Sequence, residues 1–206
     1  MHLATRSTSV LALAGLASAL GARAQAQETS ETPAPRHSSA QRGVEVTLST
    51  EAVGLGFRTP FDVDDSFRIG ALFDDDDDWA VDGRWLHHVV TVSEDVPVSF
   101  SLGLAGDVIS FDRPDAEVFA LAAAGSAEVQ FPIELPSRFV LDLAYAPDLT
   151  TFDDGDEVRD VGVRFECDVT PRATLFLGYR ELEAEFEGRG EKELDGHLGV
   201  GLRFAI

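Results

Sequence analysis

The stretch LDGHLGVGLRFAI, from Leu194 to Ile206, alternates two kinds of residue without a slip. Successive side chains of a β-strand point to opposite faces, so the stretch predicts a strand with one apolar face and one polar or bare face. The apolar face consists of Leu194, Gly196, Leu198, Val200, Leu202, Phe204 and Ile206. Such a face packs either on the core of a soluble sheet or against the lipid around a membrane barrel.

The composition limits the class of protein. The chain of 206 residues carries 37 acidic and 16 basic residues, a net charge of −21. This charge argues against a nucleic-acid partner, because phosphate binding needs Lys and Arg. Beyond the N-terminus no apolar run reaches the roughly 18 residues of a membrane-spanning helix. Cys167 is the only cysteine, so one chain can build neither a disulfide nor a thiolate metal site.

The N-terminal region predicts export. Residues 1–26 have the pattern of a signal peptide, with Arg6 at the positive start, an apolar run from Val10 to Ala22, and the small residues Ala24 and Ala26 before the cleavage site. Residues 27–42 are rich in Ser, Thr, Pro, Glu and Gln and predict a flexible periplasmic leader. The sequence therefore assigns the folded domain to residues 43–206.

Alternating segments separated by turn residues fill that domain. A parity switch at Thr50-Glu51 predicts a hairpin between the first two segments. The expected strands are 44–48, 53–57, 67–73, 79–92, 98–108, 119–131, 139–145, 161–169, 175–180 and 194–206. A barrel that begins and ends in the periplasm needs an even number of strands. The sequence therefore predicts an all-β, antiparallel transmembrane barrel of ten strands, or of eight if the first hairpin is left out.

The connections divide into two sets when they are counted back from the C-terminus. The loops 74–78, 112–115, 147–157 and 187–193 fall outside the cell, and most of the longest and most acidic connections are among them. The turns 93–95, 132–136 and 170–171 fall in the periplasm. This agrees with the short periplasmic turns and longer external loops of outer-membrane barrels.

Charged residues of both signs share the parity that faces the barrel interior. The six most clearly placed are Arg84, Asp142, Arg164, Glu166, Arg180 and Arg203, joined by Arg68, Arg138, Asp82, Asp107, Glu128 and Asp160. Buried charges need partners, so this set predicts a salt-bridged interior in a structural or surface-exposed membrane component. The alternative is a narrow polar channel.

Other polar clusters predict little chemistry. The run Asp74, Asp75, Asp76, Asp77 and Asp78 offers oxygen ligands for Ca²⁺ or Mg²⁺, although like-charge repulsion favours a solvated loop. His87 and His88 are adjacent, so they point to opposite faces of a strand and do not chelate one ion. His197 with Ser99 or Ser101 has no nucleophile motif. We therefore expect no cofactor and no enzymatic activity, with a lipid-modifying enzyme or a soluble β-sandwich as the less favoured alternatives.

The segment from His197 to Phe204 resembles the C-terminal β-signal of bacterial outer-membrane barrels, with His197, Gly199, Leu202 and Phe204 at its defining positions. The resemblance implies recognition by the barrel-assembly machinery, and partners in outer-membrane lipid and lipopolysaccharide.

Several segments together resemble the YfaZ family of proteobacterial outer-membrane proteins. They are Val46 to Glu51, Tyr145 to Pro147, Asp168 to Pro171, Leu177 to Arg180 and His197 to Phe204. The resemblance spans the region after the signal peptide and is dense from about Tyr145 onward. It implies an outer-membrane β-barrel and carries no established activity to any residue.

Overall fold

The computed structural model describes residues 42–93, 95–112, 115–131, 133–186 and 190–206. The predicted signal peptide and residues 27–41 of the predicted leader lie outside this part of the chain. The elements are β1 (Gly43–Leu48), β2 (Ala52–Pro60), β3 (Asp65–Asp74), β4 (Trp79–Val92), β5 (Val98–Phe111), β6 (Ala116–Phe131), β7 (Ser137–Ala146), the 3-10 helix η2 (Asp148–Thr150), β8 (Thr151–Asp153), β9 (Gly155–Thr170), β10 (Ala173–Phe186) and β11 (Gly190–Ala205). Within the described residues, no helical segment has the length and the hydropathy of a membrane span.

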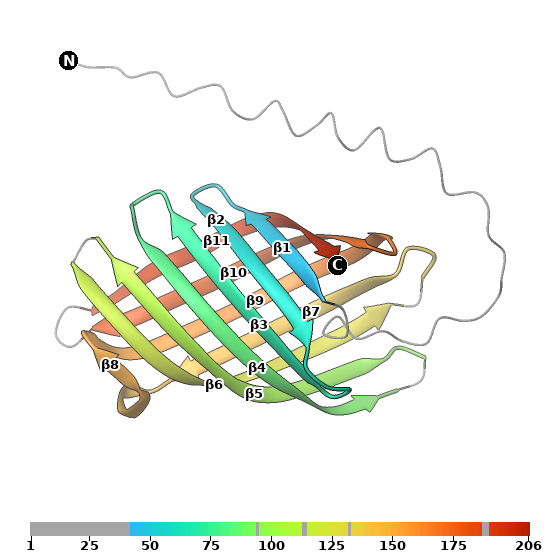
Figure 1. Cartoon of the computed structure of the whole chain (residues 1–206), viewed down its shortest axis with the longest axis horizontal. Coiled ribbons are helices and arrows are strands. Elements are labelled where there is room, and N and C mark those ends of the chain that lie inside the picture. The colour runs from blue at the N-terminus through green and yellow to red at the C-terminus, as the bar shows by residue number, and fades with distance from the viewer. Residues whose placement is uncertain (1–41, 94, 113–114, 132, 187–189) are drawn as a thin grey trace, which may run out of the picture. The chain divides into compact units, whose positions relative to one another are not determined.

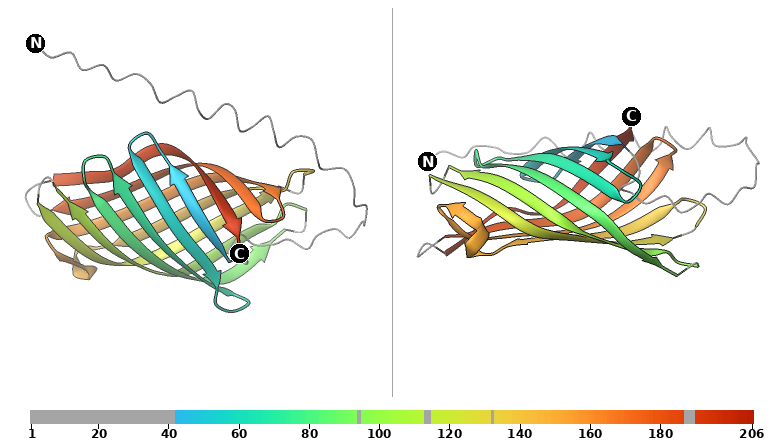
Figure 2. Two further views of the ribbon diagram at one scale, coloured as in Figure 1. Left: turned by 45° about the horizontal axis from the view of Figure 1, so that its top comes forward. Right: turned by 60° about the horizontal axis from the view of Figure 1, so that its bottom comes forward.

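Ten of these strands form one closed antiparallel sheet. Their order is β5-β4-β3-β2-β1-β11-β10-β9-β7-β6, and pairing between β5 and β6 closes the ring. The first and last strands lie side by side, with Val44 opposite Phe204 (Figure 1). The two further views show the tilted strands passing around both sides of the barrel (Figure 2). The predicted ten-stranded barrel is confirmed, and the alternatives of eight strands and of a two-sheet sandwich are wrong.

The first hairpin explains why ten strands form. Ser49 donates its backbone N–H to the carbonyl of Ala52, and the Ser49 hydroxyl oxygen accepts the N–H of Ala52 at 2.9 Å. This compact turn reverses the chain at the predicted parity switch. It keeps Val44 and Leu48 on the same face as Val53 and Leu55. Both short strands can therefore pair without turning an apolar residue inward.

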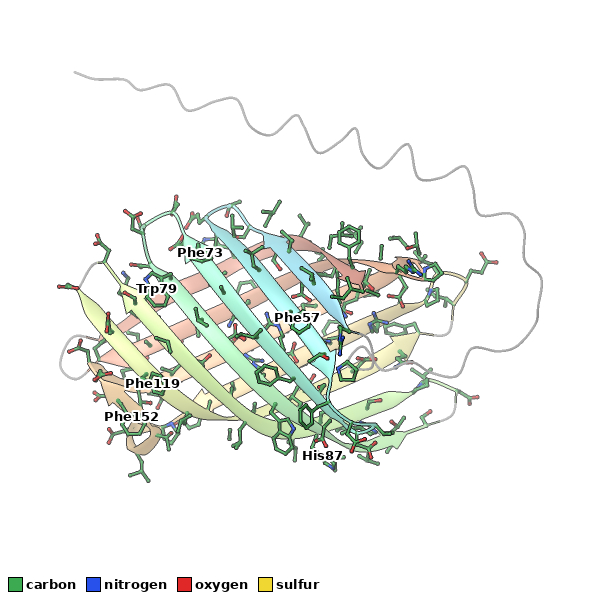
Figure 3. All side chains as sticks on the ribbon, in the orientation of Figure 1. Phe57, Phe73, Trp79, His87, Phe119 and Phe152 are labelled. Carbon is green, nitrogen blue, oxygen red and sulfur yellow. The ribbon has the colours of Figure 1, made fainter. Side chains whose placement is uncertain are left out.

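The outer surface of the barrel is apolar. Every strand of the ring exposes at least one large apolar side chain: Val44, Leu55, Ile69, Trp85, Leu104, Leu121, Leu143, Phe165, Leu177 and Val200. Phe73, Trp79 and Phe119 lie on this surface in Figure 3. Most of the buried charged side chains lie on the opposite parity. A closed sheet that is apolar outside and polar within is the arrangement of a transmembrane barrel.

Two of the predicted acidic loops are shorter than expected. Strand β9 begins at Gly155, so Glu157 belongs to a strand, and β11 begins at Gly190, so Glu191 and Glu193 do as well. Residues 148–153 form η2 and β8, and β8 pairs with β6. Acidic residues have a weak preference for strands. Here β10 buries Leu182 and Phe186 on its inner face, and this packing holds the neighbouring acidic segments of β9 and β11 in strands.

The predicted outward position of Leu194 is wrong. The pairing of β10 with β11 shifts register, so Leu182 lies opposite Asp195 while Glu183 lies opposite Glu193. The extra residue is a bulge, which changes the direction of the side chain at that point. Leu194 therefore packs in the interior.

The lipid-facing surface gives a first prediction. Leu104, near the middle of β5, is 63% exposed, and an Arg near the bilayer midplane costs about 2 to 4 kcal/mol. We expect Leu104→Arg to reduce the free energy of unfolding in lipid vesicles by about that amount, as measured by urea titration. Leu104→Phe should change it little. If the two variants were equally stable in vesicles, the outer face would not lie in lipid.

Candidate functional site: the barrel interior

The barrel has two distinguishable ends. We call the end where β1 begins and β11 ends the terminal end, and the opposite end the loop end. The interior contains two layers of different chemistry. The charged layer comprises Glu45, Arg68, Asp82, Arg84, Arg138, Asp142, Asp160, Arg164, Glu166, Arg180 and Arg203. The apolar plug, toward the loop end, comprises Ile109, Phe111, Val118, Val158, Leu182, Phe186 and Leu194.

Ion pairs of the charged layer cross the lumen. Arg180 on β10 lies 3.2 Å from an oxygen of Asp82 on β4. Four strands separate β4 from β10 in either direction around the ring, so this pair joins opposite walls. Arg84 on β4 likewise pairs with Asp160 on β9, which Arg180 also binds at 2.7 Å. These contacts connect the two opposite walls at the same height along the barrel axis.

A second network joins β1, β7, β9 and β11. The Glu45 carboxylate accepts from Arg164 and from Arg203, both at 3.3 Å. Glu166 is 0% exposed and is bound by Arg138 at 2.7 Å and by Arg203. Arg164 also donates to Asp142 at 2.9 Å. All six interior residues singled out in the sequence therefore lie in these two networks.

Glu45 was missed by the sequence reasoning. Its signal was present, because Glu45 stands on the opposite parity to the outward-facing Val44 and Val46. The same signal exists for Arg58 on β2, which stands on the opposite parity to the apolar Leu55 and Phe57. Only closure of β1 against β11 brings Glu45 to Arg203, which is 158 residues away in sequence.

The apolar plug was also not predicted. The rings of Phe111 and Phe186 meet edge to face, with centroids 5.5 Å apart. The Lys192 ammonium lies 4.6 Å from the Phe111 ring centroid and binds Asp78 at 2.7 Å, so an ion pair caps the plug. The continuous apolar run 118–124 was its sequence signal, because such a run indicates a strand that is apolar on both faces.

The described part of the interior contains cavities between the charged side chains. The first cavity, of about 40 Å³, is lined by Arg58, Arg68, Arg84, Ser99, Ser101 and Ser126, among others. The second cavity, of about 80 Å³, is lined by Glu45, Thr47, Gly54 and Phe176, among others. Arg68, Arg84 and Asp142 line both cavities and so stand between them.

Asp107 stands at the boundary between the two layers. Its side chain is 1% exposed, and in the described residues neither carboxylate oxygen accepts a hydrogen bond. Asp107 lies opposite Asp82 on β4 and opposite Ala120 on β6. A buried polar group without a partner costs about 1 to 3 kcal/mol. This carboxyl therefore weakens the interior rather than holding it together.

The contrast between two buried aspartates gives a second prediction. We expect Asp160→Ala to lower the free energy of unfolding by about 3 to 5 kcal/mol, because Arg84 and Arg180 would lose a buried partner. Asp107→Ala should leave it unchanged or raise it. Urea unfolding of both variants in the same vesicles decides this. Equal losses would show that Asp107 also has a stabilising partner.

The run from Asp74 to Asp78 does not act as one group. Carboxylate oxygens of Asp74, Asp75 and Asp76 lie within 4.8 Å of one another, and Asp77 has a positive φ of 67° in the turn. Asp78 is buried, binds Lys192 and accepts the N–H of Asp112 at 2.7 Å. It therefore supports the plug, and a loop-bound cation stays a prediction for the other aspartates.

The residues of the predicted assembly signal lie along the closing strand β11. Phe204 is exposed on the outer surface, Leu202 is half-buried, and His197 lies 3.2 Å from Glu51. A Cβ at Gly199 would lie 3.2 Å from the Leu48 carbonyl oxygen and from Thr47, so this position leaves little room for a side chain. The signal therefore coincides with the seam at which the barrel closes.

The remaining polar candidates do not form a catalytic group. Ser99 and Ser101 line the first cavity, whereas His197 lines the second. Ser99 contacts the Thr91 hydroxyl at 3.1 Å. His87 points outward beside Asp65, and His88 lines the first cavity, so the predicted opposite orientation of the two histidines is confirmed.

Comparison with known proteins gives only distant likenesses. No family model and no curated protein matches the chain. Among solved structures, the chain is similar to a bacterial polysaccharide outer membrane secretin, with 13% identity and a TM-score of 0.42 over 75% of this chain and 56% of that one. It is similar to the outer membrane channel DcaP of Acinetobacter baumannii, with 11% identity and a TM-score of 0.36 over 79% and 54%.

A third similar structure is the NanC porin, with 11% identity and a TM-score of 0.40 over 80% of this chain and 100% of that one. The chain spans a little more than half the length of the first two proteins. The chain's own strand pairing, which closes the ring, and its apolar outer face establish a transmembrane β-barrel of the outer-membrane type.

Proposed function

We propose that the protein is a sealed outer-membrane barrel that serves as a structural or surface-exposed membrane component, without enzymatic activity. The observation that carries this proposal is the pairing of Arg84 and Arg180 with aspartates on the opposite wall. These side chains occupy the lumen at the level where a solute would have to pass. A barrel of about ten strands is narrow enough for side chains to fill.

The apolar plug adds a second barrier in series. Constrictions lined by apolar side chains exclude water and so block ions. Phe111 and Phe186 meet across the interior near the loop end, and Lys192 covers Phe111. A hydrated ion would therefore have to separate the buried ion pairs and also enter an apolar region. This supports a sealed barrel over a diffusion pore.

A narrow channel is the second candidate, and the two cavities favour it. They share Arg68, Arg84 and Asp142 as lining residues, so a change in the side-chain positions of these residues would join them. The apolar plug would still have to open before the joined cavities reached the loop end.

The proposed orientation places the terminal end in the periplasm and the loop end at the cell surface. On the outer surface, Tyr145 donates to Glu157 at 2.9 Å and Tyr179 donates to Glu181 at 2.8 Å. Tyrosines of this kind lie at membrane interfaces, with the ring in the apolar region and the hydroxyl in the polar one.

The partners we propose are outer-membrane lipid and lipopolysaccharide, together with the barrel-assembly machinery. Membership of the YfaZ family likewise remains a proposal.

The seal gives a third prediction, tested in planar lipid bilayers. The wild-type protein should give no conductance steps. A double variant, Phe111→Ala with Phe186→Ala, removes the aromatic contact of the plug. A quadruple variant also carries Arg84→Ala and Asp160→Ala, which remove one cross-lumen ion pair and both of its charges. We expect steps only when all four substitutions are combined, because the two barriers act in series.

The control for this experiment changes the lipid face alone. Leu102→Ala with Leu104→Ala removes two large side chains that do not face the lumen, and it should leave the barrel closed. Stable conductance steps from the wild-type protein would reject the sealed barrel in favour of the narrow channel.

The fourth prediction concerns assembly. Phe204 faces outward on β11 opposite Val44, so its loss leaves the interior contacts in place. We expect Phe204→Ala to lower the amount of assembled barrel in cells, because the aromatic residue of the signal is missing, and to change little the stability of protein refolded in vesicles. The amount of heat-modifiable barrel in outer membranes measures the first effect. If the Phe204→Ala protein assembled in wild-type amounts, the interpretation of this segment as a β-signal would be wrong.

A further inference from the structure

The first cavity lies in the half of the interior nearer the terminal end. Ser66 and Ser99 line it from the starts of β3 and β5, and Glu128 lines it near the end of β6. Asp82, Asp160 and Arg180 of the charged layer, together with the apolar plug, lie between this cavity and the loop end. A ligand would therefore enter from the terminal end.

Hydrogen-bond donors dominate the wall of this cavity. Arg58, Arg68 and Arg84 line it together with four serines, Ser66, Ser99, Ser101 and Ser126. Arg84 is 5% exposed, and its Nε–H has no hydrogen-bond partner in the described residues. The Nε–H of Arg68 is likewise without a hydrogen-bond partner there. A guanidinium carries its donors in a planar fork that matches oxyanions.

The residues that line the cavity include three basic side chains, those of Arg58, Arg68 and Arg84, and two acidic ones, those of Glu128 and Asp142. Asp142 lines the cavity, but Arg164, which does not line it, donates to Asp142 at 2.9 Å. Glu128 accepts from the amide of Gln130 at 2.8 Å. The acidic partners of Arg68 and Arg84, which are Glu45, Asp82 and Asp160, do not line the cavity. The arginines therefore line the cavity, whereas the carboxylates that bind them do not.

We propose that the first cavity binds a small oxyanion, such as inorganic phosphate or a short carboxylate. The donor set selects an anion, since guanidinium and hydroxyl groups both donate to oxygen and no lining carboxylate is left without a partner. The volume of about 40 Å³ selects a small one and excludes a sugar chain or a nucleotide. This site does not depend on whether the barrel conducts.

The test uses the folded chain in neutral detergent with radiolabelled inorganic phosphate as the probe, in equilibrium dialysis. Sodium gluconate keeps the ionic strength constant, because its polyol chain is too large for the cavity. We expect saturable binding of one phosphate per chain. Acetate competes if the site takes carboxylates as well, and it leaves phosphate binding unchanged if the site takes only tetrahedral oxyanions.

Two variants locate the site. Ser101→Leu fills the cavity without removing an ion pair, and we expect it to weaken phosphate binding about tenfold or more, the loss that follows when one charged hydrogen bond is broken. Thr47→Leu changes a residue that lines only the second cavity and should leave binding unchanged. Heat-modifiable gel mobility verifies that each variant is folded. If Ser101→Leu does not fold, Arg68→Gln takes its place with the same expected loss.

Binding that does not saturate would overturn the proposal. So would full binding by the folded Ser101→Leu or Arg68→Gln protein, because the phosphate would then lie elsewhere. A loss in Thr47→Leu equal to that in Ser101→Leu would move the site to the second cavity and would also overturn it.

Discussion

Arginines that reach across the lumen to aspartates on the opposite wall are the interaction on which the interior depends. Arg180 and Arg84 both bind Asp160, and Arg180 also reaches Asp82. A charge buried without a partner is strongly unfavourable, so these side chains tolerate neither a wider barrel nor a shifted register. The same ion pairs therefore constrain the radius of the ring and the heights of β4 and β10 along the barrel axis. They also close the lumen.

The two layers of the interior have different physical roles. The charged layer fixes which residues face one another, because each carboxylate needs a particular arginine, as Glu166 needs Arg138 and Arg203. The apolar plug excludes water near the loop end, where its packing also keeps acidic segments of β9, β10 and β11 in strand form. Asp107 lies at the boundary between the layers, and neither layer provides a partner for its carboxylate, since its neighbours across the strands are Asp82 and Ala120.

The seam between β1 and β11 connects assembly with the interior. Glu45 enters the charged layer only once β1 has paired with β11, because its partner Arg203 lies on β11. The small residues of β11 suit this seam. A side chain at Gly199 would press on β1, and one at Gly201 would overlap the ring of Phe176 on β10, the other neighbour of β11. Closure of the barrel and completion of the buried salt bridges are therefore one event.

Alternation of apolar and polar residues was enough to predict the ten strands, their antiparallel order and the inward parity of residues such as Arg164 and Glu166, because the period of a strand is local. The sequence alone could not show which inward charges meet, since Arg84 and Asp160 are 76 residues apart. It also could not show the bulge that turns Leu194 inward, or the plug around Phe111 and Phe186. Those features depend on contacts across the lumen, which exist only after the ring has closed.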